Sequence, residues 1–190
     1  MRFFHGKITL DVPDSVYYPR EDSLLLAKII EKEQLQGKKC IDIGCGSGFL
    51  AILMAKASNE PNIMAADISE DAVKTAKENA TRNNVKIKAL ASDLFSSIDE
   101  KFDLIVFNPP YLPTEDGDKT YDGGKSGRDT VERFIRESRS HLNENGKILL
   151  LISSLTGEKE VLNIFQKNRF SARIIVRKKV PWEELMVIEA

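Results

Sequence analysis

The sequence predicts an α/β protein built around a mostly parallel sheet, because short apolar runs alternate with longer segments whose apolar residues recur every three or four positions. The expected strands are residues 40–43, 63–66, 85–90, 104–107, 147–152, 172–176 and 185–188. The expected helices are residues 49–57, 71–82, 130–141 and 158–167, preceded by a helix from residue 23 to about residue 34. Strands that alternate with helices typically form a sheet covered on both faces.

The last two expected strands depart from this alternation. Only residues 177–184 separate them, which is too short a segment for a helical crossover. We therefore expect them to pair as an antiparallel hairpin, which places one reversed strand in an otherwise parallel sheet.

Length and composition predict a single domain with a sizeable core. The chain has 190 residues, of which 42% are hydrophobic. We expect residues 1–36 to form an N-terminal lid segment with a helix, and residues 37–190 to form the catalytic core. The 28 basic and 29 acidic residues nearly cancel, so the net charge of −1 gives no support for a broad nucleic-acid-binding face.

Neither a membrane span nor a signal peptide is expected. The longest aliphatic run, residues 148–152, is far shorter than the ~20 apolar residues of a spanning helix, and the N-terminus has no apolar stretch before its first acids. Cys40 and Cys45, with only two histidines in the chain, support neither a disulfide framework nor a structural zinc site, so no metal is expected. We therefore expect a cytoplasmic protein.

A glycine-rich turn follows the first expected strand. Residues 42–48 (DIGCGSG) carry Gly44, Gly46 and Gly48 at every second position, which allows a sharp turn and close approach of a ligand to the next helix. Dinucleotide-binding proteins use a related turn, but Phe49 stands where their Gly-x-Gly-x-x-Gly fingerprint has its third glycine. The bulk of Phe49 favours a smaller nucleoside cofactor, bound by the three glycines.

Acidic residues follow or end the first three strands. Asp67 could accept both ribose hydroxyl hydrogens, or could simply favour the dipole of the next helix, and we group its neighbour Ile68 with the cofactor-binding residues. Asp93 could accept from an adenine amino group while Leu94 packs on the ring, or could be an ordinary loop acid. Asp42 ends an apolar strand, where a charge is costly unless paired, so its expected partner is a ligand ammonium or the amides of the glycine turn.

The most specific motif is Asn108-Pro109-Pro110-Tyr111, directly after the fourth strand. Two consecutive prolines stiffen the loop and remove amide donors, which leaves carbonyl groups exposed at the edge where open α/β sheets place ligands. The Asn108 side-chain oxygen and the Pro109 carbonyl could accept both hydrogens of a planar NH2 group, and Tyr111 could pack against that group. The alternative is a proline-stiffened turn in which Asn108 satisfies its own backbone.

Together, the strand pattern and these motifs resemble the Rossmann-like class I S-adenosylmethionine methyltransferases. The resemblance implies a seven-stranded sheet with strand order 3-2-1-4-5-7-6 and strand 7 antiparallel, and S-adenosyl-L-methionine as cofactor. The Asn-Pro-Pro-Tyr motif resembles that of members which methylate planar nitrogens, either protein glutamine or adenine in DNA and RNA. Asn108, Pro109, Pro110 and Tyr111 are then the catalytic residues.

Two flanking segments narrow the resemblance. Residues 17–26 (YYPREDSLLL) and 121–128 (YDGGKSGR) resemble the short archaeal and eukaryotic branch of the HemK-type glutamine N5-methyltransferases. That resemblance implies methylation of the Gly-Gly-Gln loop of a class 1 translation release factor, with Ser23 contacting the cofactor. The bland alternatives are that Ser23 or Asp22 is only a helix N-cap and that residues 114–127 form an ordinary surface loop.

The resemblance also raises the possibility of a partner protein. Eukaryotic members pair with a small zinc-binding activator subunit by strand addition at the sheet edge. Here the alternating lysines of residues 85–90, the expected edge strand, count against an obligate partner, because lysines protect an edge from pairing.

Other functions remain open on the sequence alone. They are an adenine or other nucleic-acid amino methyltransferase, a protein lysine methyltransferase, and a binding module without activity. A dinucleotide-dependent oxidoreductase is disfavoured by Phe49.

Overall fold

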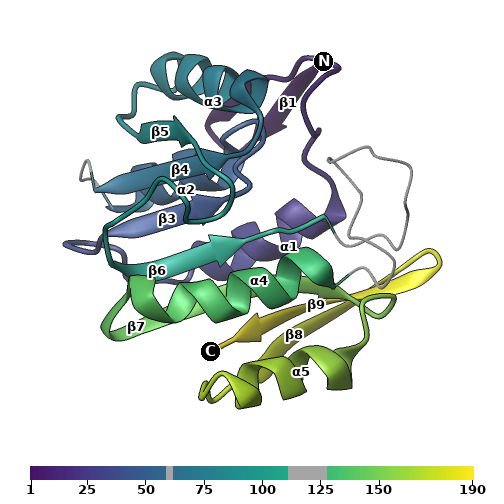
Figure 1. Ribbon diagram of the computed structural model, residues 1–190. Coiled ribbons are helices and arrows are strands. Elements are labelled where there is room, and N and C mark those ends of the chain that lie inside the picture. The colour runs from purple at the N-terminus through teal and green to yellow at the C-terminus, as the bar shows by residue number, and fades with distance from the viewer. Residues whose placement is uncertain (59–61, 111–127) are drawn as a thin grey trace.

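The computed structural model describes residues 1–58, 62–110 and 128–190, and over these residues it forms a seven-stranded sheet between two layers of helices (Figure 1). The mixed α/β class predicted from the sequence is therefore confirmed. The strands of this sheet are β3 (Cys40–Ile43), β4 (Ile63–Asp67), β5 (Lys88–Ala91), β6 (Phe102–Phe107), β7 (Leu142–Ser153), β8 (Arg173–Val180) and β9 (Glu183–Glu189).

The strand order of the sheet is β5-β4-β3-β6-β7-β9-β8, which is the predicted order once counting starts at β3. All pairs from β5 to β7 are parallel, whereas β9 is antiparallel to both of its neighbours, β7 and β8. The reversed strand is thus the last one, as the short connection before it predicts.

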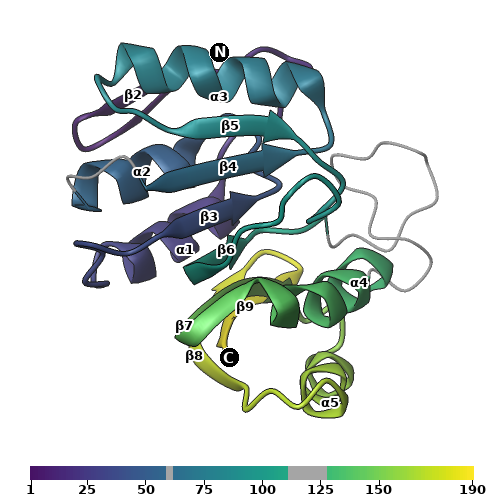
Figure 2. The same cartoon turned by 60° about the vertical axis from the view of Figure 1, so that its left-hand side comes forward.

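Helices cover both faces of the sheet, as Figures 1 and 2 show. Helices α1, α2 and α3 pack on one face, and α4 and α5 pack on the other. In β6, Leu104 and Val106 face the first layer while Ile105 and Phe107 face the second, so alternate residues of one strand serve two cores. The helices are α1 (Glu21–Ile30), α2 (Phe49–Ser58), α3 (Glu70–Arg82), α4 (Asp129–Ser138), α5 (Glu158–Lys167) and the short 3-10 helix η1 (Arg139–His141).

Several predicted boundaries were wrong by a few residues. Helix α1 begins at Glu21 rather than at residue 23, so that neither Asp22 nor Ser23 is its N-cap, and it ends at Ile30 rather than near residue 34. The amides of Lys32 and Glu33 bond carbonyls only three residues back, which closes the helix with tight turns.

The N-terminal segment contains a hairpin that the sequence analysis did not predict. Strands β1 (Arg2–His5) and β2 (Ile8–Asp11) are antiparallel, with Gly6 in the left-handed region at a φ of 54° in the turn between them. Each strand has only four residues, too few for a clear periodicity, although Ile8 and Leu10 alternate with half-buried residues. The segment 1–36, which we expected to form a lid with a helix, thus contains a folded hairpin before α1.

Asn79 joins this hairpin to the rest of the molecule. Its side-chain oxygen accepts from the Asp11 amide at 2.9 Å, and its side-chain nitrogen donates to the carbonyls of Asp11 and Ser47, each at 3.0 Å. Asn79 is buried in α3, and Ser47 belongs to the glycine-rich turn. One side chain thus connects the hairpin, a helix and the turn that enters α2.

No helix among the described residues is long and apolar enough to cross a membrane.

Replacing Asn79 should destabilise the fold. Asn79→Ala removes one buried and two part-buried hydrogen bonds to the backbone, and we expect it to lower the free energy of unfolding by about 2–4 kcal/mol, since an unsatisfied buried polar group costs roughly 1–3 kcal/mol. Urea denaturation measures the change. The neighbouring Glu78→Ala, at an exposed position of the same helix, is the control and should change stability by no more than about 0.5 kcal/mol. Equal effects of the two substitutions would contradict the role assigned to Asn79.

Candidate active site

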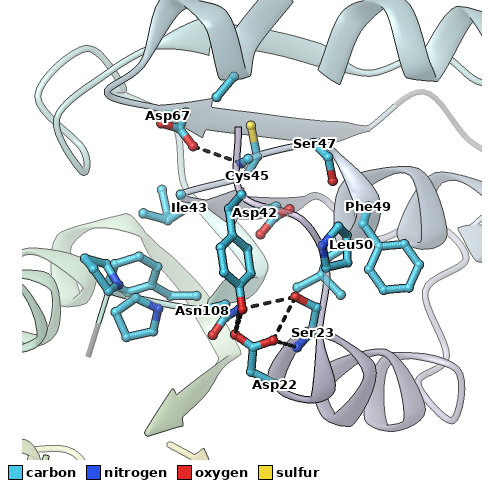
Figure 3. Close-up of a pocket in the computed structure, with 18 of the residues that line it drawn as sticks. Asp22, Ser23, Asp42, Ile43, Cys45, Ser47, Phe49, Leu50, Asp67 and Asn108 are labelled. Carbon is cyan, nitrogen blue, oxygen red and sulfur yellow. Dashed lines mark hydrogen bonds between the residues drawn. The ribbon is translucent and has the colours of Figure 1, made fainter. Parts of the chain in front are cut away.

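A cavity of about 1020 Å³ opens at the carboxyl ends of β3, β4 and β6. Open α/β sheets bind ligands at this edge, because the loops that follow neighbouring parallel strands meet there. The cavity gathers residues that follow all three strands, the start of α1 and the tip of the β8–β9 hairpin. Figure 3 shows how the side chains from these elements converge.

The glycine-rich turn supplies the floor of this cavity. Gly44, Gly46 and Gly48 all have positive φ angles, of 64°, 49° and 80°, and Gly44 and Gly46 line the cavity. Gly48 does not line it. A Cβ atom at Gly48 would lie 2.9 Å from the backbone of Ala76, so this glycine serves the close packing of the turn against α3.

The predicted ribose acid, Asp67, is held in place by backbone amides. Its Oδ2 accepts from the Gly46 amide at 2.9 Å and its Oδ1 from the Ser69 amide at 2.9 Å. Burial raises the pKa of Asp67, while these amides oppose the shift. Each carboxylate oxygen retains a further lone pair for a hydroxyl donor. Asp67 and the half-exposed Ile68 both line the cavity.

The predicted adenine-binding pair, Asp93 and Leu94, also lines the cavity. Leu94 is buried with a φ of 50°, and its carbonyl accepts from the Ser92 hydroxyl at 2.9 Å, which holds this turn in shape. Arg133 of α4 forms an ion pair with Asp93, in which Arg133 Nη2 lies 2.9 Å from Asp93 Oδ2. Arg133, which lines the cavity as well, was not predicted, because its position follows from the packing of α4.

Asp42 is a buried carboxyl at the deep end of the cavity. The Ala51 amide of α2 donates to it, but its Oδ2 has no hydrogen-bond partner within the described part of the chain. Burial, together with the charge of Asp67, raises the pKa of Asp42 to about 8. The amide that reaches Asp42 comes from α2, whereas Gly46 of the glycine turn bonds Asp67 instead. Asp42 Oδ2 thus remains an acceptor that no described group of the protein fills.

Asn108, the first residue after β6, is held by the start of α1. Its side-chain NH2 group donates to Asp22 Oδ2 at 2.9 Å and to the Ser23 hydroxyl at 3.4 Å. The Tyr17 hydroxyl donates to the same Asp22 oxygen at 2.7 Å, and the other Asp22 oxygen accepts from the Ser23 amide at 2.6 Å. Figure 3 shows this network of hydrogen bonds around Asp22.

This network decides which way the Asn108 amide faces. A carboxylate only accepts hydrogen bonds, so the amide must present its NH2 group to Asp22 and its oxygen to the other side. That oxygen, Oδ1, is buried and has no partner in the described residues, and Asn108 lines the cavity. The site therefore holds a fixed acceptor that lacks a donor.

The remaining residues of the quoted motifs divide into three groups. Pro109, Pro110 and Ser23 line the cavity, and Ser23 also contacts Asn108. Tyr111 and the segment 114–127 lie outside the described residues. Asp22 and Tyr17 belong to the conspicuous segment 17–26, but the sequence did not reveal their link to Asn108, because 86 residues separate Asp22 from Asn108.

The two cysteines are free and buried. Burial raises the pKa of the Cys40 thiol to about 12 and that of Cys45 well above its usual range. Neither is a nucleophile at neutral pH, since the thiolate is the reactive form.

Comparisons with known proteins agree on one family. The family model of the methyltransferase small domain matches residues 21–173. A Methanocaldococcus jannaschii protein assigned as a protein N5-glutamine methyltransferase is 45% identical over 190 residues, which cover 96% of this chain and 95% of that protein. The release factor glutamine methyltransferase of Streptococcus pneumoniae is 32% identical, over 97% of this chain and 70% of the relative.

Solved structures show the same fold. The Mtq2-Trm112 complex of E. cuniculi, described as responsible for the methylation of the eRF1 translation termination factor, matches with a TM-score of 0.76 and 26% identity. The alignment covers 92% of this chain and 97% of the matched chain. The class I methyltransferase fold implied by the sequence is thereby confirmed.

The buried carboxyl of Asp42 should make stability depend on pH. Its folded pKa of about 8 lies above the ~3.9 of an unfolded aspartate, so its contribution to stability is fully present below about pH 4 and is lost as the pH rises towards 8. Asp42→Asn does not titrate. We therefore expect this variant to gain several kcal/mol over the wild type between pH 4 and pH 8, about 5 kcal/mol for the full shift, measured by urea unfolding without ligand.

The control for this prediction is Asp14→Asn, which removes an exposed carboxyl. Its difference from the wild type should change by no more than about 0.5 kcal/mol over the same interval. A pH-independent difference for Asp42→Asn would contradict the strained state assigned to this carboxyl.

Proposed function

The chain belongs to the methyltransferase small domain family, and we propose that, as an S-adenosylmethionine-dependent enzyme, it methylates the side-chain N5 of the glutamine in the Gly-Gly-Gln motif of a class 1 translation release factor. One observation carries the reaction type. The buried Asn108 Oδ1 is an acceptor held by Asp22 and left without a donor beside the cavity. A primary amide supplies the donor that this oxygen lacks.

The site fits the cofactor on its own chemistry. The unpartnered Asp42 carboxyl suits the ammonium of the methionine portion, and Asp67 suits the ribose hydroxyls. Asp93 and Leu94 suit the adenine, one through its second carboxylate oxygen and the other through its apolar side chain. Ser23, Gly44, Gly46 and Ile68, which also line the cavity, complete the proposed cofactor-binding residues.

The proposed catalytic work of the chain is positioning. When bound, S-adenosylmethionine supplies an electrophilic methyl group on a sulfonium. An amide nitrogen is a poor nucleophile because its lone pair is delocalised into the carbonyl. Asn108 Oδ1 and the Pro109 carbonyl accept its two hydrogens, which holds the plane of the amide and stabilises the positive charge that develops on nitrogen.

This arrangement favours an amide over a lysine side chain. An amide nitrogen offers two hydrogens in one plane, which matches two acceptors on one rigid loop. A lysine ammonium carries three hydrogens and has no lone pair until it loses a proton. The exocyclic amino group of adenine offers the same two hydrogens as the glutamine amide, so labelling of a release factor in competition with nucleic acid must distinguish the two substrates.

The proposal extends to location and partners. The enzyme meets its release factor in the cytoplasm, where translation terminates. The existence of the Mtq2-Trm112 complex supports a small protein partner. Strand addition at a sheet edge, as the family resemblance implies, would place that partner at β5, the edge strand opposite β8. Lys88 of β5 is paired with Glu100, which leaves less positive charge to oppose such an addition.

Labelled S-adenosylmethionine tests the substrate directly. The chain is incubated with a release factor whose Gly-Gly-Gln glutamine is intact or replaced by asparagine, and with tRNA and DNA as competitors. The assay is run with the chain alone and with a small zinc-binding activator protein added, so that the need for a partner is measured separately. Label confined to the intact factor is the expected result. Label on nucleic acid alone, or equal label on both factors, would refute the proposal.

A second experiment tests how Asn108 is oriented. Asn108→Ala should lower kcat by at least 100-fold with little change in cofactor affinity. Asp22→Asn should lower kcat nearly as much. Each oxygen of Asp22 accepts from donors, one from Asn108 and the other from the Ser23 amide, so an asparagine at position 22 must turn its NH2 group towards one of them. We expect a fall of about 100-fold in kcat, the usual cost of one lost transition-state acceptor or donor.

Cofactor affinity and folding separate this role from a structural one. The cofactor Kd of Asp22→Asn should stay close to that of the wild type, whereas Asp67→Ala should weaken cofactor binding. The thermal midpoint of Asp22→Asn should fall, because a buried acceptor is lost, so kcat is measured at a temperature at which circular dichroism shows the variant to be folded. Wild-type kcat in Asp22→Asn would remove Asp22 from the mechanism as a positioning residue.

A further inference from the structure

The tip of the β8–β9 hairpin presents Trp182 to solvent. Trp182 is the only tryptophan in the 190 residues, and 98% of its surface is exposed. A tryptophan side chain offers a large apolar area with few rotatable bonds, and it is enriched among the residues that dominate binding between proteins. An apolar ring of this size left wholly in water has no packing role in the described structure.

The backbone at this position is strained as well. Trp182 has a φ of 76°, in the left-handed region that glycine adopts freely and bulky residues avoid. Glycine would therefore suit the turn better than tryptophan, so the local fold does not explain this side chain. Strain of this kind at an exposed residue points to a use outside the fold.

The hairpin tip is anchored on both sides. Glu183 accepts a short hydrogen bond from the Ser153 hydroxyl, and the Glu184 amide donates to the Ser154 hydroxyl at 3.0 Å. On the other strand, Lys178 forms an ion pair with Glu21 at the start of α1. These contacts connect the turn to the end of β7 and to the helix that carries Asp22. Trp182 is thus carried by a fixed element of the active-site wall.

The tip is also continuous with the cavity. Val180, Pro181 and Glu183 line the same cavity as Asn108, whereas Trp182 itself does not. Figure 1 shows the hairpin reaching the end of the molecule where β6 ends. A small molecule held at Asn108 would leave Trp182 untouched, but a macromolecule whose reacting group enters the cavity would cover it.

We propose that Trp182 is a docking residue for the release factor whose glutamine is to be methylated. In this proposal the Trp182 ring packs against the surface of the release factor next to its Gly-Gly-Gln loop. This inference rests on the function proposed above. Charge favours a protein over a nucleic acid. The hairpin tip has no excess of basic side chains. Arg177 pairs with Glu158 and Glu184, Lys178 pairs with Glu21, Lys179 stands opposite Glu184 in the strand register, and the acid Glu183 follows Trp182 directly.

Steady-state kinetics with intact release factor test the proposal. Trp182→Ala should raise KM for the release factor about tenfold, which corresponds to about 1.4 kcal/mol of lost binding. Its kcat should stay within about twofold of the wild type, and its cofactor Kd should not change. Trp182→Phe keeps an aromatic ring and should recover most of the affinity. Phe4→Ala removes another exposed aromatic side chain that does not line the cavity, and it should leave KM unchanged.

A direct binding measurement uses the single tryptophan. Chain labelled with 5-fluorotryptophan gives one 19F resonance, which reports Trp182 without interference from the unlabelled factor. Unmodified release factor should shift or broaden this resonance. A resonance that moves with tRNA or DNA but not with the release factor would overturn the proposal, and so would an unchanged KM for Trp182→Ala.

The two proposals fail in distinguishable ways. Absence of label on the release factor with the wild-type chain refutes the proposed function. Normal labelling by both the wild type and Trp182→Ala, with equal KM values, leaves the function intact and refutes the docking role. Trp182→Ala should keep the wild-type thermal midpoint, because the ring makes no buried contact.

Discussion

The active site depends on one hydrogen bond, between the Asp22 carboxylate and the Asn108 amide. An isolated asparagine side chain can turn either end towards a ligand, and the two ends have opposite chemistry. Because a carboxylate cannot donate a hydrogen bond, the Asn108 NH2 group must face Asp22, and this leaves Asn108 Oδ1 as an acceptor beside the cavity. The start of α1 and the end of β6 must therefore meet for this site to recognise an NH2 group. The packing of α1 against its face of the sheet serves that meeting.

The same site lowers the stability of the ligand-free fold. Asp42 and Asn108 each bury an oxygen that has no partner among residues 1–58, 62–110 and 128–190, and each such group costs free energy that the ligand-free fold must tolerate. Two layers of helices on a sheet whose strands alternate between two cores offset that cost. The unpaired atoms lie where ligand groups are expected and not at random in the core. In the proposed function, cofactor and substrate supply the missing partners, so that binding recovers the free energy that folding gave up.

Two hairpins frame the sheet in different ways. The N-terminal hairpin is fastened to α3 through Asn79 and Asn83, and it packs Phe3 against Phe49 behind the glycine turn. The C-terminal hairpin completes the sheet and carries its tip to the cavity, where Trp182 faces solvent. One hairpin stabilises the entry to α2, and the other extends the wall of the cavity to an exposed tryptophan. Neither role is visible in the strand order itself.

Much of this architecture is determined locally. Alternation of apolar runs with helical segments was enough for the α/β class and the terminal antiparallel hairpin, whereas the strand order came from the resemblance to class I methyltransferases. Asp67, Asp93 and Asn108 could be placed because the ends of parallel strands meet at one edge. Four-residue strands such as β1 lacked a readable period, and Arg133 and Trp182 gave no signal in a motif. The sequence by itself determined the fold and the chemistry at the strand ends. Only the tertiary structure decided the orientation of Asn108 and the exposure of Trp182, because both depend on contacts, or on their absence, between segments far apart in the chain.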